Sequence, residues 1–179
     1  ADGTKTVTGT HIYADNGPYL VTITVTDDDG GEDSDGLFVT IANAAPVVLA
    51  GGAASVDEGV TFELPPTFFT DAGSGDTHTA LVDFGDGTVV PGAIDLATGR
   101  VSASHTYADN GSFLVTVTVT DDDGATGTGT WSVTAENVAP VAGDDAYETN
   151  EDIVLEIAAP GLLVNDTDVE KAKLHSVRH

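Results

Sequence analysis

The sequence contains no cysteine and no methionine, and it has very few basic residues. Without cysteine the chain cannot form disulfide bonds, cysteine-ligated zinc sites or a catalytic thiolate. Only 5 of the 179 residues are lysine or arginine, against 30 aspartates and glutamates. This charge disfavours nucleic acid and anionic membranes as partners. No apolar run reaches the roughly 18 residues that a membrane-spanning helix needs, so we expect no membrane insertion.

Aromatic residues make up only 6% of the chain, yet 40% of it is hydrophobic, which argues against disorder. Apolar side chains occupy every second position in residues 19–25 and 113–119, the period of a half-buried strand. No long segment has helical periodicity, and the sequence therefore predicts an all-β sandwich. Further predicted strands lie at residues 60–64, 81–84, 131–133 and 153–157.

An internal repeat organises the chain. Residues 11–30 (HIYADNGPYLVTITVTDDDG) and 105–124 (HTYADNGSFLVTVTVTDDDG) are identical at 16 of 20 positions, with an offset of 94 residues. Extended backwards, the alignment pairs Ala1 with Asp95, so the first repeat is present only from its midpoint.

Ala-Pro-Val joints at residues 45–47 and 139–141 bound one complete unit. Proline at such joints removes a ladder donor and stiffens the connection between modules. The sequence changes character after the second joint, and its last nine residues reverse the charge. We predict a half repeat at 1–46, a complete domain at 47–140, the start of a different module at 141–170 and a tail foreign to the modules at 171–179.

Three motifs follow one another within the complete unit. They are V-D-F-G-D-G at 82–87, H-x-Y at 105–107, and a strand at 113–119 that closes on T-D-x-x-G at 120–124. In this order and spacing they resemble the polycystic-kidney-disease (PKD) domain. The resemblance implies Ig-like antiparallel β-sandwich modules arranged in tandem.

Residues 141–170 resemble the opening of a bacterial cadherin-like Ig repeat, with D-D-x-Y at 144–147 and N-D-x-D at 165–168. Both families occur in tandem on large secreted or surface-exposed bacterial proteins. The resemblances therefore imply an extracellular or cell-surface location. They also imply a role as a stalk, an adhesion module or an accessory module attached to a hydrolase.

Aspartates gather in the expected loops, and carboxylates are the oxygen ligands that calcium prefers. No segment matches an EF-hand loop or a glycine-aspartate nonapeptide repeat. The alternative to calcium binding is that these loops are hairpin tips whose charges are solvated by water. Related domains can hold calcium near the end of the module that carries the loop at 71–76. The candidate calcium ligands are Asp71, Asp76 and Asp83 near that end, and Asp144, Asp145, Asp166 and Asp168 at the following joint.

Catalytic motifs are absent: the sequence has no G-x-S-x-G and no H-E-x-x-H. We therefore predict that the chain is not an enzyme. The H-x-Y motif suggests that Tyr107 ties its hydroxyl to a loop backbone, as in the tyrosine corner of Ig folds. Trp131 with Tyr107 and Phe113 offers an alternative, a sugar-stacking surface. Because Trp131 aligns with Leu37 in the other repeat, we predict that it lies in the core.

These patterns predict a structural or adhesive spacer that is sensitive to calcium and contacts a protein or polysaccharide surface. The alternatives are an accessory module that binds carbohydrate or matrix for a secreted hydrolase, and an enzyme fragment. Residues 1–46 should have unpaired edges, so we expect them to be disordered in isolation or paired with another chain. A strand pair in 141–170 would be the acceptor, giving a homo-oligomer by strand complementation.

Overall fold

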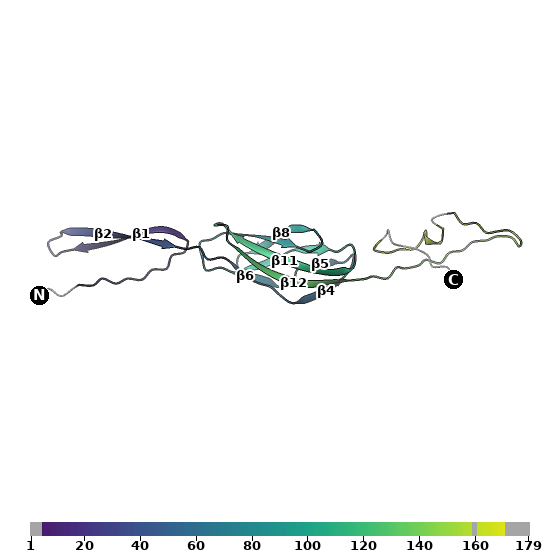
Figure 1. Ribbon diagram of the computed structural model, residues 1–179, viewed down its shortest axis with the longest axis horizontal. Coiled ribbons are helices and arrows are strands. Elements are labelled where there is room, and N and C mark those ends of the chain that lie inside the picture. Colours follow the sequence, from purple (N-terminus) through teal and green to yellow (C-terminus); the bar gives the residue numbers. More distant parts are fainter. Residues whose placement is uncertain (1–4, 159–160, 171–179) are drawn as a thin grey trace.

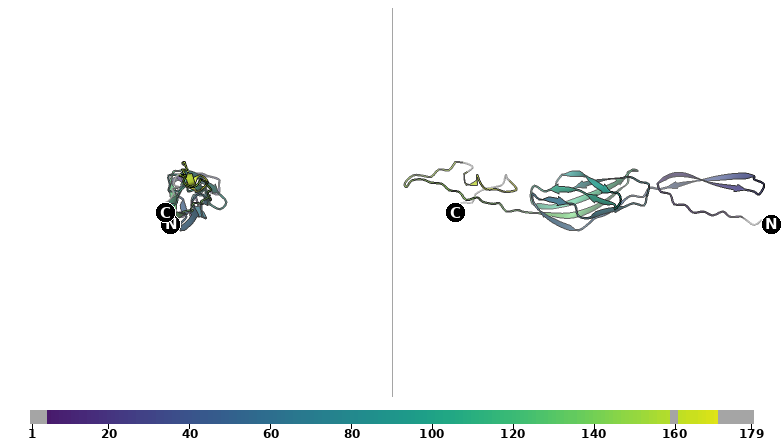
Figure 2. Two further views of the ribbon diagram at one scale, coloured as in Figure 1. Left: turned by 90° about the vertical axis from the view of Figure 1, so that its right-hand side faces the viewer. Right: turned by 180° about the vertical axis from the view of Figure 1, so that it is seen from behind.

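The computed structural model describes residues 5–158 and 161–170. These residues form three parts in a row, a hairpin, a central β-sandwich and an irregular C-terminal segment, and the molecule is elongated (Figure 1). The views from the end and from behind show the same linear arrangement of the three parts (Figure 2). No described helix has the length and apolar character required to cross a membrane.

The hairpin consists of β1 (Gly17–Thr26) and β2 (Glu32–Ile41), which pair antiparallel from Gly17 opposite Ile41 to Thr26 opposite Glu32. Its turn is held by Asp27, whose Oδ1 accepts hydrogen bonds from the backbone N–H groups of Asp29 (3.1 Å) and Gly31 (2.6 Å). Aspartate favours such turns because its short side chain bonds to the backbone that follows. The strand predicted at 19–25 is confirmed.

The first layer of the sandwich is built on β11 (Gly111–Asp121) and β12 (Thr126–Glu136), the counterparts of the two hairpin strands. β7 (His78–Asp83) pairs antiparallel with the other edge of β11. β4 (Ala53–Asp57) runs parallel to β12.

The second layer contains β3 (Val47–Leu49), β6 (Thr67–Thr70), β9 (Arg100–Ser102) and part of β8 (Val89–Asp95). Residues 89–92 of β8 pair with β7, and residues 93–95 pair with β9, so this strand passes from one layer to the other. β3 also lies near β11 and β12, which closes the two layers on each other. A ribbon of β5 (Thr61–Glu63) and β10 (Ser104–Thr106) covers one end. The chain is thus an all-β, Ig-like sandwich, as predicted.

The core lies between these layers and follows the period-two pattern of β11. Val115, Val117 and Val119 are fully buried, and the core aromatic residue Tyr107 is 1% exposed. The Tyr107 hydroxyl donates a hydrogen bond of 3.0 Å to the carbonyl oxygen of Phe84. This bond joins the H-x-Y segment to the strand end before the F-G-D-G turn, as the sequence predicted.

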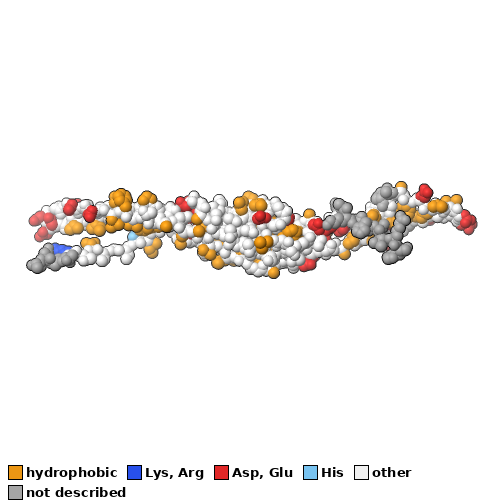
Figure 3. Space-filling view, viewed as in Figure 1, with side chains coloured by type: hydrophobic (Ala, Val, Ile, Leu, Met, Phe, Trp, Pro, Cys, Tyr) orange, Lys and Arg blue, Asp and Glu red, His pale blue; other side chains and the backbone are white. Residues whose placement is uncertain are grey.

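The hairpin repeats this sequence without a second layer over it. Val25 is 61% exposed whereas its counterpart Val119 is fully buried, and Val7 is 68% exposed whereas Val101 is fully buried. Hydrophobic side chains are visible along the hairpin in the space-filling view (Figure 3). In the complete domain the facing strands are β3, β6, β9 and part of β8, and no described strands lie over β1 and β2 in the same way.

The C-terminal segment contains a short 3-10 helix, Gly161–Leu163, and one isolated bridge between Val141 and Thr167. The strand predicted at 153–157 is wrong, because no described segment pairs with those residues and Val154 is 80% exposed. An alternating sequence becomes a strand only where a neighbour accepts its backbone hydrogen bonds. The strand pair expected as an acceptor for residues 1–46 is therefore not formed in the described part of 141–170. Residues 171–179, predicted to be a foreign tail, lie outside the described residues.

Replacing Tyr107 with phenylalanine should destabilise the domain, because the buried Phe84 carbonyl loses its donor. We expect a loss of about 1–3 kcal/mol in the free energy of unfolding, measured by urea titration. The repeat supplies a matched control: Tyr13, the counterpart of Tyr107, lies in the segment before β1, outside the core, and Tyr13→Phe should change stability little. Equal losses in the two variants would contradict this assignment.

Burial, with a smaller contribution from Asp86, raises the pKa of Tyr107 to about 12 from an ordinary value of 10.0. The folded state therefore holds this proton more tightly than the unfolded state. Stability should be unaffected by this group below pH 10 and should fall as the pH rises from about 10 towards 12. The Tyr107→Phe variant lacks this hydroxyl, so its stability, measured by unfolding between about pH 10 and 12, should not show the fall that is due to Tyr107.

Candidate metal site

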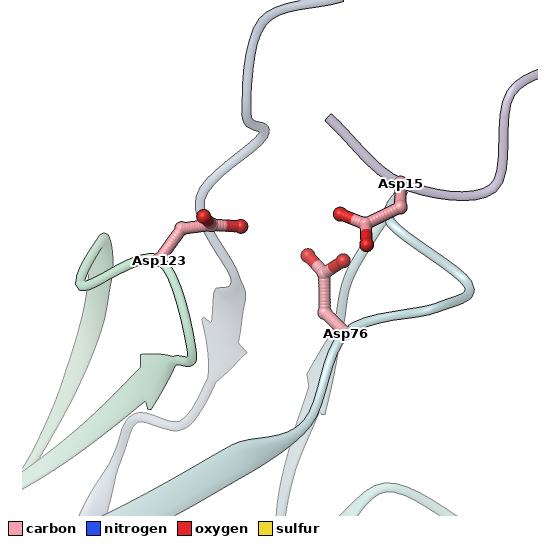
Figure 4. A group of neighbouring side chains, drawn as sticks. All are labelled: Asp15, Asp76 and Asp123. Carbon is pink, nitrogen blue, oxygen red and sulfur yellow. The ribbon is translucent and has the colours of Figure 1, made fainter. Parts of the chain in front are cut away.

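The junction between the hairpin and the sandwich brings acidic side chains from three segments together. Asp15 lies just before β1, Asp76 in the loop between β6 and β7, and Asp123 in the turn between β11 and β12. Asp15 and Asp76 point toward each other, and Asp123 points toward both (Figure 4). One carboxylate oxygen from each lies within 4.8 Å of the others.

A second group overlaps the first, because oxygens of Asp71, Asp76 and Asp121 also lie within 4.8 Å of one another. Asp71 is held by His78, whose Nε2 lies 2.9 Å from Asp71 Oδ2, and by the backbone N–H of Gly73 at 3.2 Å. Asp71 and its histidine partner are almost fully buried. This acid is therefore fixed in place, facing Asp76.

Asp121 is held just as firmly. Its Oδ1 accepts the backbone N–H of Ala125 at 2.7 Å, and its Oδ2 accepts the Asn43 side-chain amide at 2.9 Å. These hydrogen bonds, with that from Asn43 the strongest influence, lower the pKa of Asp121. Asn43 belongs to the connection after the hairpin, so its bond ties that connection to the sandwich.

Asp76 is the acid whose charge is least compensated. Its Oδ2 is buried and has no hydrogen-bond partner among the described residues. Burial raises the pKa of Asp76, and the neighbouring charges of Asp71, Asp15, Asp122 and Asp121 raise it further. A bound cation would offset both effects.

A cavity of about 130 Å³ adjoins these acids, lined by residues 13–16, 41–44, Ala72, Gly73 and Asp76. Gly75 donates its N–H to the carbonyl oxygen of Ala14 at 2.9 Å, which links the loop between β6 and β7 to the segment before β1. The clustered ligand atoms are all carboxylate oxygens, which suit a hard cation such as calcium. The residues present thus fit a calcium ion.

The structure brings Asp71 and Asp76 together but leaves Asp83 apart. On β7, His78 lies opposite Asp121 whereas Asp83 lies opposite Thr116, so Asp83 is at the far end of the strand. There its Oδ1 accepts the Gly85 N–H at 2.9 Å. The acids that sequence reasoning missed are Asp15, Asp121 and Asp123; the repeated A-D-N-G and D-D-D-G segments that carry them were the available signal.

The four candidate ligands in the C-terminal segment do not converge in the described structure. Asp166 Oδ1 accepts the Gly143 N–H at 2.8 Å, and the Asp144 backbone carbonyl accepts the Asn165 side-chain amide at 3.0 Å. Asp145 is exposed. Asp168 Oδ1 is buried without a hydrogen-bond partner among the described residues.

The three aromatic residues considered as a sugar-stacking surface are not presented together to solvent. Tyr107 is 1% exposed, and Phe113 stacks on it with ring centroids 4.3 Å apart. Trp131 packs against the core, and its Nε1 donates a hydrogen bond of 3.0 Å to Thr67 Oγ1. Trp131 is therefore a core residue, as predicted.

These features define an Ig-like sandwich module whose clustered acids lie at a junction between modules. A protein-family model described as "PKD domain" matches residues 1–41 and 43–135. The chain belongs to the PKD-domain family, whose members are non-catalytic modules that are typically extracellular. The resemblance noted in the sequence is confirmed; the cadherin-like identity of residues 141–170 stays a prediction.

Among solved structures, the chain is similar to the "PKD domain of M14-like peptidase from Thermoplasmatales archaeon SCGC AB-540-F20". The two are 28% identical, with a TM-score of 0.41, and the match covers 51% of this chain and 92% of that chain. No curated protein matches the sequence.

Replacing Asp76 with asparagine should stabilise the protein in EDTA at neutral pH, because it removes the uncompensated charge. A carboxyl whose pKa is raised on folding lowers stability as the pH rises through and above its ordinary value of 3.8. The advantage of Asp76→Asn should therefore disappear when thermal unfolding is measured below about pH 4. Asp28→Asn, at the exposed hairpin tip, is the matched control; an equal gain there would show a general charge effect instead.

Proposed function

We propose that the chain is a semi-rigid extracellular spacer whose module junctions are stiffened by calcium. The observation that carries this proposal is the origin of the acid cluster at the first junction. Asp15 belongs to the first repeat, whereas Asp76 and Asp123 belong to the complete domain. A cation bound to all three would join the two modules directly.

Few direct bonds cross this junction. Gly75 N–H reaches the Ala14 carbonyl, and the Asn43 amide reaches Asp121, each at 2.9 Å. Without a cation, repulsion between Asp15 and the acids of the sandwich opposes these bonds. Salt screens charges over about 8 Å at physiological ionic strength, farther than the 4.8 Å within which these oxygens lie, so screening leaves much of the repulsion.

The elongated arrangement suits a spacer, because the hairpin and the sandwich lie end to end (Figure 1). The length of such an array depends on how far each junction bends. Calcium at the junction would hold the modules in line, and its removal would let them move. A display or tethering role would follow from this mechanical property.

The accessory-module alternative receives no support from the aromatic residues first considered for it, since Tyr107 and Trp131 serve the core. Retention on insoluble chitin, cellulose or collagen would nevertheless favour that alternative over the spacer. We expect no retention in a pull-down. Self-association through residues 1–46 stays a prediction, and light scattering that shows a strict monomer would count against it.

Calcium should narrow the range of hairpin orientations, and the cysteine-free sequence makes this straightforward to measure. Spin labels on Thr22→Cys in β1 and Ser112→Cys in β11, both exposed positions, report the distance across the junction. Pulsed electron-spin measurements should give a narrower distance distribution in calcium than in EDTA. Asp76→Asn should remove the narrowing, and Asp28→Asn should retain it.

Calcium should also raise the melting temperature of the protein, and the size of this rise can be estimated. At about 100 times the Kd, calcium bound at one site stabilises the folded state by about 2.7 kcal/mol. For a domain of this size that corresponds to a rise of roughly 10–20 °C in Tm. An equal rise in magnesium at matched ionic strength would rule out a specific calcium site at this junction.

A further inference from the structure

The opposite end of the complete domain carries a second acid cluster, separate from the first. Glu58 lies in the turn after β4, Asp109 in the segment before β11, and Glu170 in the C-terminal segment. One oxygen of each lies within 4.8 Å of the others. Two acids thus come from the sandwich and one from the chain that follows it.

Glu58 is the unusual member because it is only 1% exposed. Its backbone N–H donates to the Glu136 carbonyl at 2.9 Å, and its Oε1 accepts the Val138 N–H at 2.8 Å. Its Oε2 is buried and has no hydrogen-bond partner among the described residues. The backbone therefore fixes a carboxylate in the interior with one oxygen unsatisfied.

An ionised carboxylate buried in this way loses hydration that a single hydrogen bond does not replace. The other members of the cluster are also carboxylates, which in their ionised form only accept hydrogen bonds. A cation at this position would compensate the buried Glu58 Oε2 and would lie within reach of the other two carboxylates. Since the donors are carboxylate oxygens from three separate segments, calcium, which accepts irregular coordination, fits better than magnesium, which demands near-ideal octahedral geometry.

The internal repeat connects the two clusters. Asp109 is the counterpart of Asp15 at the offset of 94 residues, and both lie in a Y-A-D-N-G segment. Asp15 faces the start of the complete domain, and Asp109 faces Glu170 in the segment after that domain. The same position of the repeat thus carries an acid to the exit end of each module.

Packing beside the cluster explains how Glu170 reaches it. Gly59 has a φ of +75°, and a Cβ built there would lie 2.6 Å from Cγ1 of Val169. The Val169 side chain therefore packs directly against the backbone of Gly59, which places the next residue, Glu170, beside the cluster. Gly59 is itself anchored by its N–H, which donates to the Tyr107 carbonyl at 2.8 Å.

We propose that Glu58, Asp109 and Glu170 form a second calcium site, which clamps residues 141–170 to the exit end of the complete domain. Water and backbone carbonyls would complete the coordination shell. The site is independent of the one at the first junction; the inference rests on the proposed function, calcium at module junctions, and extends it to the second junction.

Calcium titration of the full chain, followed by ¹⁵N–¹H NMR, tests the two sites separately. The amides of Gly59 and Val138 report on the second site, and those of Gly75 and Thr77 report on the first. In the wild type and in Asp76→Asn, calcium should shift the Gly59 and Val138 signals saturably. Glu58→Gln should weaken that response by about tenfold or more, because a charged ligand is lost.

Glu58→Gln keeps an oxygen that can accept the Val138 N–H, so the variant should remain folded. Asp109→Asn provides a second test that leaves Glu58 untouched, and it should weaken the same response. Glu63→Gln, an exposed glutamate on β5, is the control of equal charge and should leave it unchanged.

The proposal is overturned if calcium leaves the wild-type Gly59 and Val138 amides unmoved, or moves them equally in Glu58→Gln. An equal response to magnesium overturns the assignment to calcium. Loss of the Gly75 and Thr77 response alone would instead contradict the site at the first junction.

Discussion

The structure depends on one constraint: a β-sheet with an apolar face needs a second layer to cover that face. β1–β2 and β11–β12 pair in the same register. β1 and β11 are identical at 7 of 10 aligned positions, whereas β2 and β12 are identical at only 2 of 10. Over β11 and β12, the layer of β3, β6, β9 and part of β8 supplies the cover, and Val119 is fully buried. Its counterpart Val25 is 61% exposed because no such layer lies over the hairpin. Coverage by a second layer thus separates the folded domain from the half module.

The two hairpins are not equivalent acceptors for that second layer, and β12 shows why. A Cβ on Gly129 would lie 2.7 Å from the Ala50 Cβ and 2.9 Å from Val48 Cγ1, so the segment containing β3 approaches closely only because β12 has glycine there. The corresponding position of the first repeat is Asp35. A carboxylate at that position would meet the apolar side chains of the approaching segment. Residues 47–50 therefore suit the second repeat and are rejected by the first, which prevents mispairing within the chain.

Local patterns predicted the features that depend on neighbouring residues, and failed where distant segments meet. Alternation located β1 and β11, and the H-x-Y motif predicted the Tyr107 hydrogen bond. Grouping Asp83 with Asp71 was wrong. A strand rises about 3.3 Å per residue, so Asp83 lies roughly 17 Å along β7 from His78, the residue that bonds Asp71. Asp15 was missed because its position beside Asp76 depends on how the hairpin meets the sandwich, which no spacing in the sequence reveals.

The acidic turns of the two repeats have different surroundings, and their charges therefore have different consequences. Asp27, Asp28 and Asp29 form an exposed hairpin tip, where water stabilises their charge. The identical run at 121–123 lies at a module junction, where Asp121 is 5% exposed and Asp123 faces Asp15 and Asp76. Hydrogen bonds lower the pKa of Asp121 there, whereas burial and the neighbouring charges raise the pKa of Asp76, so the uncompensated charge of this junction lies on Asp76. In a tandem array every such turn that meets a preceding module becomes a junction. In the function we propose, cations at these junctions would offset the acidity of the repeat wherever two modules meet.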